Sequence, residues 1–475
     1  MNRVHAFTDD ALGDHDAVGL VEALQRGEVT PAELVEAAIA RTEQVDAELN
    51  AVAYAAYDQA RAQARDPRGG YFSGVPTFVK DNVDVAGMPT LHGTDAWVGR
   101  PCREDGDFAR MYRMTGLVTL GKTRLSEYGF PPTVEHPRLG PVRNPWSPEH
   151  TAGGSSAGSA VLVATGAVPF AHAMDGGGSI RIPASVNGLV GLKPTRDRVP
   201  QDKAIRDQPV RICADGVLTR TVRDTAAFIR ESEKIYRNLA LPPVGDITRP
   251  GRKRLRVSVV TSAMGQEASP EVVELTHRVA SVLEELGHTV VEDDVPPLDP
   301  RFKDDFLTYW ATLSLFLLRN GRRLHGRTWD RSKHDAFTLG LERHAARRLH
   351  RLPGAIARLR RSRHLSAEYF RRYDVVLAPT LAKETPRIGH LDPTQPFEEM
   401  LARILDWMLF TPLQNATGDP AISLPLATTS GGLPLGMQFA AGAGREATLL
   451  ELAYEVEEAI PFASITAAPA RRARS

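Results

Sequence analysis

The sequence from residue 144 to residue 195 reads NPWSPEHTAGGSSAGSAVLVATGAVPFAHAMDGGGSIRIPASVNGLVGLKPT and decides the fold. Two of its serines each follow a run of glycines: Ser155 follows residues 153–154, and Ser179 follows residues 176–178. Glycine-rich loops allow backbone N–H groups to come close to a reacting atom. The small, apolar segment at 157–168 lies between the two loops and is expected to form a buried helix. Two such loops on either side of a buried helix indicate a functional site.

The length and composition of the chain are those of a large globular protein. It has 475 residues, of which 42% are hydrophobic and 24% are charged, so two or three domains would be the usual expectation. Only two cysteines occur, Cys102 and Cys213, and neither lies in a C-x-x-C pair or a cysteine–histidine cluster. We therefore expect no disulfide scaffold and no structural zinc site, and a reducing compartment is the natural setting.

The N-terminal region does not resemble a targeting segment. The first thirty residues include Asp9, Asp10, Asp14 and Asp16 and contain no apolar core, so they are not expected to be a signal peptide. No run of about eighteen apolar residues occurs in the sequence, and no membrane association is expected. These features predict a cytoplasmic protein.

Charge is distributed unevenly along the chain, although the formal net charge is zero. Residues 319–372 contain sixteen arginines or lysines against four acidic residues. A basic segment of this kind can mark a nucleic-acid surface. Solvated helix faces whose arginine stems cover apolar surface are the favoured interpretation, because the aromatic residues expected of a base-stacking surface are missing. We therefore expect no nucleic-acid partner.

Strands alternate with helices along the chain, which predicts the α/β class. A short apolar strand at 74–82 carries Lys80 near its end, and residues 255–291 read as a strand, a helix and a strand. Residues 216–224 are expected to begin a helix. We predict an N-terminal tail at 1–15, one domain over 16–466 with a helical, arginine-rich excursion at about 300–372, and a basic tail at 467–475.

The two glycine–serine loops exclude several kinds of catalytic site. The first lacks the G-K-[ST] ending of a phosphate-binding loop, and neither is a G-x-S-x-G turn. His172 lies among apolar residues of a predicted strand and is interpreted as a packed core residue, so a nucleophilic serine would need another base. A neutral lysine can serve. Depressing the pKa of Lys80 from about 10.4 to near 7 requires on the order of 4–5 kcal/mol, which burial without a close carboxylate provides.

These loops resemble the signature of the amidase signature family, in which two serine-containing glycine loops recur together. Further matches are GVPTFVKD at 74–81, GLKPT at 191–195 and LTRTVRD at 218–224. The stretch AHAMDGGGSIRIPAS at 171–185 is similar to the subgroup that contains nylon-oligomer cyclic-dimer hydrolases. The resemblance covers nearly the whole chain, and it implies a large, twisted mixed β-sheet flanked on both faces by helices.

The resemblance also implies a catalytic triad, with Ser179 as nucleophile, Ser155 on a non-proline cis peptide as proton relay, and Lys80 as base. Acyl transfer to Ser179 and hydrolysis of the acyl-enzyme would need no metal or organic cofactor. Ala157 and Met174 replace residues common in the family, and neither change removes a reacting group. The loop is implied to supply an oxyanion hole from the backbone N–H groups of Gly176, Gly177, Gly178 and Ser179, with Asp175 and Arg181 bracing it and Ser156 bonding within its own loop.

The substrate is implied to be a small-molecule amide, but its identity stays open among aryl amides, linear or cyclic oligoamides and acyl hydrazides. Candidate pocket residues are Tyr128, Phe130, Phe316 and Trp407, each of which could equally be an ordinary core aromatic. The arginine-rich segment, as a lid, would favour uncharged or anionic substrates over cationic ones. The family resemblance further suggests a homodimer. Two alternatives are an amidase-type subunit of a tRNA-dependent amidotransferase and a non-hydrolytic binding protein on the same fold.

Overall fold

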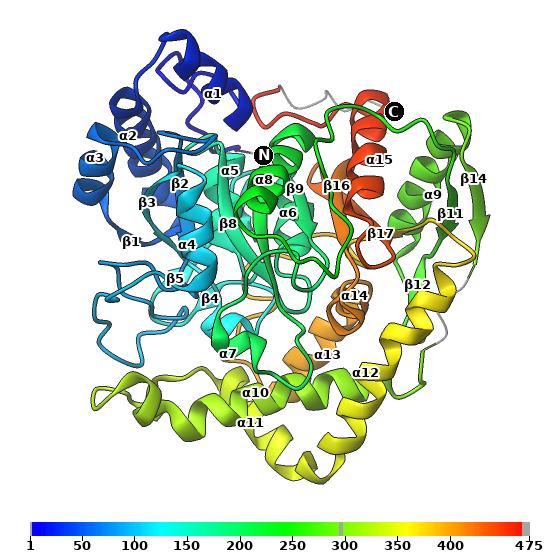
Figure 1. The fold of residues 1–475 in the computed structure, drawn as a ribbon. Helices are drawn as coiled ribbons and strands as arrows, with labels where there is room; N and C mark the ends of the chain where they lie inside the picture. Colours follow the sequence, from blue (N-terminus) through cyan, green and yellow to red (C-terminus); the bar gives the residue numbers. More distant parts are fainter. Residues whose placement is uncertain (1, 294–297, 468–475) are drawn as a thin grey trace.

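The computed structural model describes residues 2–293 and 298–467 (Figure 1). The basic tail predicted at 467–475 lies outside the described residues except for Ala467. In the described part of the chain, the largest sheet has eight strands in the order β14-β11-β15-β17-β16-β9-β10-β8. Its strands are β8 (Phe170–Asp175), β9 (Val190–Lys193), β10 (Ala214–Thr219), β11 (Arg256–Val259), β14 (Thr289–Glu292), β15 (Val375–Pro379), β16 (Ala421–Thr428) and β17 (Pro434–Ala441).

This sheet is mixed, as the family resemblance implied. The pairs β14–β11 and β11–β15 are parallel, and every following pair through β8 is antiparallel. A second sheet has three strands in the order β1-β3-β2, which are β1 (Val52–Ala55), β2 (Pro76–Lys80) and β3 (Val118–Thr123). Three short hairpins are formed by β4 (Glu135–His136) and β5 (Gly140–Pro141), by β6 (Arg143–Asn144) and β7 (Ser147–Thr151), and by β12 (Ser262–Ala263) and β13 (Gln266–Glu267).

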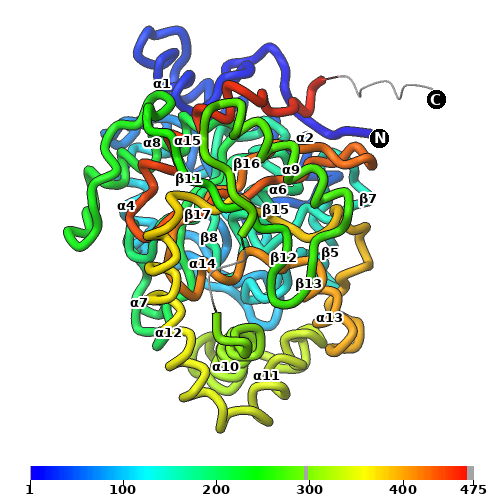
Figure 2. The backbone as a smooth tube through the Cα atoms, turned by 90° about the vertical axis from the view of Figure 1, so that its right-hand side faces the viewer, coloured from blue at the N-terminus to red at the C-terminus, as the bar shows by residue number. Residues whose placement is uncertain are grey.

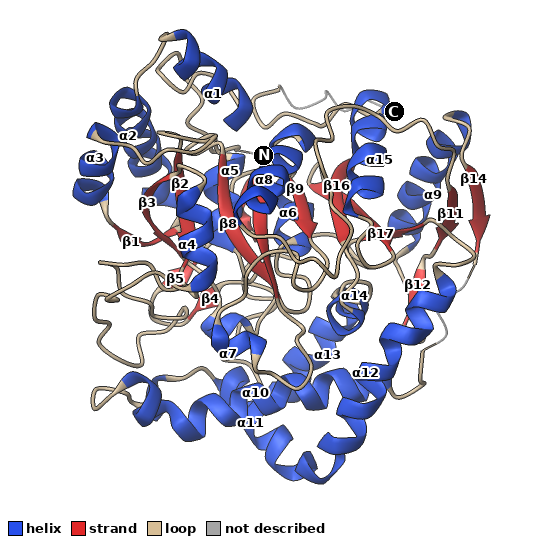
Figure 3. Ribbon diagram, in the orientation of Figure 1, coloured by secondary structure: helices blue, strands red, loops and turns tan. Residues whose placement is uncertain are grey.

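Helices flank the large sheet on both faces (Figure 3). The chain has helices α1 (Ala17–Arg26), α2 (Pro31–Leu49), α3 (Tyr57–Arg65), α4 (Asp107–Met114), α5 (Ala157–Ala164), α6 (Arg181–Asn187), α7 (Lys203–Arg206), α8 (Val222–Ile235), α9 (Pro270–Glu285), α10 (Phe302–His325), α11 (Ala336–Arg348), α12 (Leu352–Tyr369), α13 (Phe397–Trp407), α14 (Pro412–Thr417) and α15 (Glu446–Ala459), and 3₁₀ turns η1 (Glu127–Gly129), η2 (Arg331–Lys333) and η3 (Leu349–Arg351).

Local sequence explains where several of these elements begin. The Thr30 hydroxyl accepts from the Glu33 backbone and the Glu33 side chain accepts from the Thr30 backbone, which is the capping box that the sequence predicts. Helix α5 is buried along its whole length because it is built from small apolar residues and has no charged side chain. It ends at Ala164, four residues before the predicted end at 168. The first glycine–serine loop leads directly into α5, and strand β8 separates this helix from the second loop.

The prediction for residues 216–224 was wrong in its first half. Residues Ala214–Thr219 form strand β10, which pairs with both β8 and β9, and helix α8 begins only at Val222 after the Thr221 cap. Pairing on both edges overrides local preference, because a central strand satisfies all its backbone groups in the ladder.

The arginine-rich segment is helical, as predicted, and forms helices α10, α11 and α12. In two views at right angles these helices lie together below the body of the sheet, on the side away from α1 and α15 (Figures 1 and 2). Among the described residues, no helix is long and apolar enough to cross a membrane.

Candidate active site

Strand β2 brings Lys80 to the end of β8 without a backbone ladder between the two strands. The Thr77 hydroxyl donates to the Phe170 carbonyl over 3.0 Å, and the Lys80 backbone N–H donates to Nδ1 of His172 over 3.2 Å. Both strands therefore run in the same direction and end at the same edge. The Lys80 Nζ lies 2.8 Å from Oγ of Ser155 and 3.1 Å from the carbonyl oxygen of Met174.

The environment of Lys80 favours its neutral form. The side chain is fully buried, and burial lowers the pKa of Lys80 to about 7, although the nearby acidic groups of Asp215, Cys213 and Asp175 act in the opposite direction. Burial removes the solvation that stabilises an ammonium, so the amine exchanges its proton near neutral pH. At that pH, Lys80 can accept a proton from the hydroxyl that it touches.

Ser155 is held in a close-packed loop. Its peptide bond with Gly154 is cis, and its side chain is buried. A Cβ on Gly154 would lie 2.8 Å from the Pro132 carbonyl carbon, so only glycine fits there. On the other side, a Cβ on Gly129 would lie 3.2 Å from Oγ of Ser155. The turn that contains Tyr128 and Phe130 therefore lies directly against the Ser155 hydroxyl.

The loop that carries Ser179 is fixed by its own acidic residue. The Asp175 carboxylate accepts from the backbone N–H groups of Gly178 over 2.7 Å and of Ile180 over 3.2 Å. The Gly178 N–H is thus not available to an oxyanion, which differs from the predicted set of donors. The N–H groups of Gly176, Gly177 and Ser179 have no hydrogen bond to any residue that the structure describes. Ser179 keeps 8% of its surface exposed.

Asp175 and Arg181 form a buried pair beneath this loop. The Arg181 Nε and Nη2 atoms lie 2.9 Å and 3.0 Å from the Asp175 oxygens, and both side chains are fully buried. Burial by itself would raise the pKa of Asp175, but the Arg181 guanidinium outweighs it and lowers that pKa to about 2. The remaining guanidinium donors reach Gln414, Gln438 and Asn415 over 2.9, 2.7 and 2.7 Å. The loop is therefore tied to β17 and α14.

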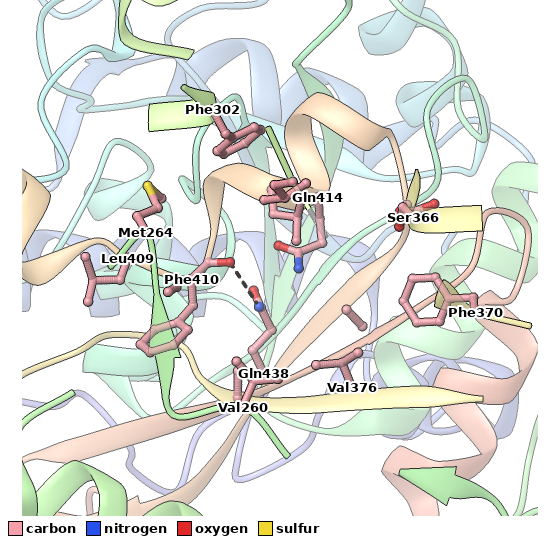
Figure 4. Close-up of a pocket in the computed structure, with 16 residues that line it drawn as sticks. Val260, Met264, Phe302, Ser366, Phe370, Val376, Leu409, Phe410, Gln414 and Gln438 are labelled. Carbon is pink, nitrogen blue, oxygen red and sulfur yellow. Dashed lines mark hydrogen bonds between the residues drawn. The ribbon is translucent and has the colours of Figure 1, made fainter. Parts of the chain in front are cut away.

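Gln414 and Gln438 also line a largely apolar cavity on the far side of this pair (Figure 4). Figure 4 shows both amides turned inward, with Phe302 and Phe410 on the surrounding walls. None of Lys80, Ser155 and Ser179 is among its lining residues. The cavity thus adjoins the side chains that support the serine loop, and it is not lined by Lys80, Ser155 or Ser179.

An aromatic wall faces the serine loop. A Cβ on Gly177 would lie 3.9 Å from the Phe306 ring, and the Trp310 ring meets Phe130 edge-on with a 5.8 Å separation of centroids. Phe306 and Trp310 lie one turn apart on α10 and share a face. The predicted pocket residue Phe316 lies on another face of α10, where 59% of its surface is exposed, so it does not join this wall.

The remaining predicted pocket residues differ in their surroundings. The Tyr128 ring packs 6.0 Å from Phe130 and 5.5 Å from His334, beside the Ser155 turn. Trp407 is buried, and its indole N–H donates to the Lys383 and Glu384 carbonyls, as expected of a core aromatic. The sequence interpretation missed Phe306 and Trp310, although the spacing of residues 302, 306, 310 and 313 on one helical face could have revealed them.

The Ser156 hydroxyl donates to the Met174 carbonyl of β8 over 3.3 Å, so the prediction that it bonds within its own loop was wrong. Among the described residues, no group of three or more histidine, cysteine, aspartate or glutamate side chains is arranged to hold a metal ion.

Comparison with known proteins identifies the family. The amidase family model matches residues 33–450. A protein of Mycobacterium leprae (strain TN) named "Putative amidase AmiC" is 59% identical over 465 residues, which cover 98% of this chain and 99% of that protein.

Two solved structures are similar over almost the whole length. One is a 6-aminohexanoate cyclic dimer hydrolase complexed with substrate (TM-score 0.87, 30% identity, 97% of this chain and 99% of that one). The other is a bacterial aryl acylamidase (TM-score 0.84, 27% identity, 95% and 97%). The protein is thus a hydrolase that acts on carbon–nitrogen bonds other than peptide bonds. The chain belongs to the amidase signature family, which confirms the resemblance found in the sequence.

Proposed function

We propose that this enzyme hydrolyses a small-molecule amide through an acyl-enzyme formed on Ser179. The observation that carries the proposal is the 2.8 Å contact between Nζ of Lys80 and Oγ of Ser155, at a lysine whose pKa burial lowers to about 7. A neutral amine at this distance can take a proton from Ser155. Ser155 in turn takes the proton of Ser179, so that the Ser179 oxygen attacks the amide carbonyl.

The oxyanion that forms in this attack needs hydrogen-bond donors. We assign this role to the backbone N–H groups of Gly176, Gly177 and Ser179, which have no partner among the described residues. Asp175 and Arg181 hold these donors in place before the reaction begins, and such preorganisation is the main source of oxyanion stabilisation. The proton then returns along Lys80 and Ser155 to the leaving amine, and water hydrolyses the acyl-enzyme.

A panel of amides, esters and acyl hydrazides tests this mechanism. Ser179→Ala is expected to abolish both turnover and the acyl adduct that mass spectrometry detects on the wild-type protein. Ser156→Ala is the matched control and should keep most of the activity, because in the described part of the chain its hydroxyl bonds only to the Met174 carbonyl. Turnover that survives Ser179→Ala would contradict the assigned nucleophile. Turnover that requires copurifying subunits would favour an amidotransferase subunit.

The aromatic wall supports an apolar acyl group on the substrate. The relatives named above act on a cyclic dimer of 6-aminohexanoate or on aryl acylamides, and both substrate types remain candidates here. Trp310→Ala is expected to lower kcat/KM for apolar amides by about 10- to 100-fold, because a large aromatic contact surface is lost. Phe316→Ala, on another face of the same helix, should leave it within about twofold. Equal effects of the two substitutions would contradict the proposed wall.

The arginine-rich lid leads to a charge preference. We propose that it favours uncharged or anionic amides over cationic ones, since residues 319–372 carry a large excess of positive charge. Matched anionic and cationic amides should therefore differ in kcat/KM, and the difference should shrink at high salt. Equal rates at low salt would contradict the preference.

Family membership is the ground for three further proposals. We propose that residues 16–466 form one domain, that the enzyme is a homodimer, and that it acts in the cytoplasm. A single cooperative calorimetric transition, light scattering of the purified protein and subcellular fractionation test these proposals in turn.

A further inference from the structure

A row of buried polar side chains lies behind Lys80, away from Ser155. The Lys80 backbone N–H donates to Nδ1 of His172, Nε2 of His172 lies 2.9 Å from Oδ1 of Asp215, and Nε2 of Gln201 donates to Oδ2 of Asp215 over 2.8 Å. All four residues are at least nine-tenths buried. They come from β2, β8, β10 and the segment that follows β9, so the row joins four separate parts of the chain.

The hydrogen bonds define which atoms carry protons. Because Nδ1 of His172 accepts from a backbone N–H, its ring proton lies on Nε2 and is donated to Asp215. Burial and the charge of Lys80 keep the pKa of His172 well below its usual value, so the ring stays neutral. Asp215 thus faces a donor at each of its two oxygens, which is the arrangement that suits an ionised carboxylate.

Strand pairing places Asp215 close to the amine of Lys80. Asp215 lies opposite Met174 in the antiparallel pair of β10 and β8, and the Met174 carbonyl oxygen is 3.1 Å from Nζ of Lys80. Directly opposite residues in such a pair lie about 5 Å apart. The diagonal neighbour His172 shares the same face of the sheet, which explains how its ring reaches Asp215.

Of the acidic groups near Lys80, Asp215 is the one that can compensate the positive charge of the protonated amine. Three acidic groups act on the amine: Asp215, Cys213 and Asp175. Asp175 is committed to Arg181, and burial raises the pKa of the Cys213 thiol to about 12, so the thiol is neutral. Burial raises the pKa of Asp215 to about 7 against the opposing effect of Lys80, so the two groups titrate in the same pH range and a proton on Lys80 favours the ionised carboxylate. Asp202 is a further acidic neighbour of Asp215.

We propose that His172, Asp215 and Gln201 form a positioning array for Lys80, in which His172 fixes its backbone and the Asp215 carboxylate stabilises its ammonium form. The inference rests on the proposed function, because the ammonium forms when Lys80 takes the proton from Ser155. Among the described residues, the side chain of Asp215 hydrogen-bonds only to His172 and Gln201. Asp215 therefore contacts no reacting atom and influences the reaction only by its electrostatic effect on Lys80, which makes it a positioning residue and not a catalytic one. No proton leaves the array in this step: Ser179 gives its proton to Ser155, Ser155 gives its own proton to Lys80, and the positive charge on Lys80 balances the negative charge on the oxyanion.

The sign of the effect of Asp215 follows from Coulomb's law. A carboxylate near the amine raises the pKa of Lys80, so replacing Asp215 with asparagine lowers that pKa further. The lysine of the variant is then neutral at lower pH but is a weaker base. The amide that Asp215→Asn introduces can keep both neighbours, because Oε1 of Gln201 has no hydrogen-bond partner among the described residues, and the Gln201 amide can turn to accept from the new amide.

The test is the pH profile of kcat/KM and of Ser179 labelling by a fluorophosphonate, measured for wild type, Asp215→Asn and Gln201→Met. In Asp215→Asn the acidic limb of both profiles is expected to move down by about one pH unit, and the plateau to fall about tenfold through kcat with KM little changed. Gln201→Met removes one donor to the carboxylate, so it should move the limb in the same direction by less. Asp419→Asn is the matched control, a buried carboxylate whose hydrogen-bond partner is Ser366, and it should leave the limb in place.

An acidic limb that stays in place or moves up in Asp215→Asn overturns the array, and so does an equal shift in Asp419→Asn. If Asp215→Asn does not fold, an unmoved limb in Gln201→Met overturns it. These outcomes leave the proposed function standing when the wild type is both labelled and active. A wild type that neither labels nor turns over any panel member overturns the proposed function and this inference together.

Discussion

The ends of β2 and β9 present the same kind of side chain in different surroundings. Lys80 closes β2 and Lys193 closes β9; both are fully buried, and burial lowers the pKa of each to about 7. The Lys80 amine meets the Ser155 hydroxyl at 2.8 Å, whereas the Lys193 amine donates to the Pro194 carbonyl over 2.8 Å. A carbonyl oxygen has no proton to give. A lowered pKa makes each lysine available as a base near neutral pH. Whether that base can act depends on whether a group with a removable proton lies next to the amine.

The largest effect should come from removing the two amines in turn. Lys80→Met is expected to lower kcat by about 10²- to 10⁴-fold, because general-base catalysis at Ser155 is lost. Lys193→Met should keep kcat within about tenfold. Steady-state kinetics on the best amide of the panel, with circular dichroism to check folding, makes the comparison. Similar losses in two folded variants would mean that the contact with Ser155 is not what distinguishes the two lysines.

The pH dependence of kcat/KM should report the titration of Lys80 and not that of Lys193. In the proposed mechanism the neutral amine is the active form, so kcat/KM should fall below a pKa of about 7 and lose about tenfold for each further pH unit. The limb should persist in Lys193→Met, since that lysine has no hydroxyl to deprotonate. If the acidic limb of the kcat/KM profile disappears in Lys193→Met, the titrating group is Lys193 at the end of β9 and not Lys80.

Much of this site could be predicted from sequence because it is local. The glycine–serine loops, the strand that ends at Lys80 and the buried helix between the loops are each encoded within a few residues. The capping box at Thr30 is of the same kind. In each case the side chains that create the feature are neighbours in the sequence, so a pattern of composition is enough.

The parts that could not be predicted depend on contacts across the chain. The local sequence of β10 predicts the start of a helix. The segment is a strand because it pairs with β8 and β9, and this pairing cannot be recognised from neighbouring residues. The contact between Asp215 and His172 follows from that strand pairing, so it could not be predicted from the sequence either. Arg181 finds Gln414 and Gln438 more than two hundred residues away. The spacing of Phe306 and Trp310 indicates one apolar face of a helix, but their contacts with Gly177 and Phe130 depend on how α10 packs against distant loops.

The smallest expected effect concerns stability, where the two lysines should behave alike. Each holds a proton in the unfolded chain up to a pKa of about 10.4 but loses it in the folded protein above about 7. Between these values the unfolded state binds more protons, so the free energy of unfolding rises with pH by about 1.4 kcal/mol per unit for each lysine. Denaturant titrations at several pH values from about 7.5 to about 9.5 give the free energy of unfolding as a function of pH. Its increase per pH unit should be lower by that amount in Lys80→Met and in Lys193→Met. An unchanged slope in either variant would mean that its lysine keeps its proton when folded; for Lys80, that would remove the base from the mechanism.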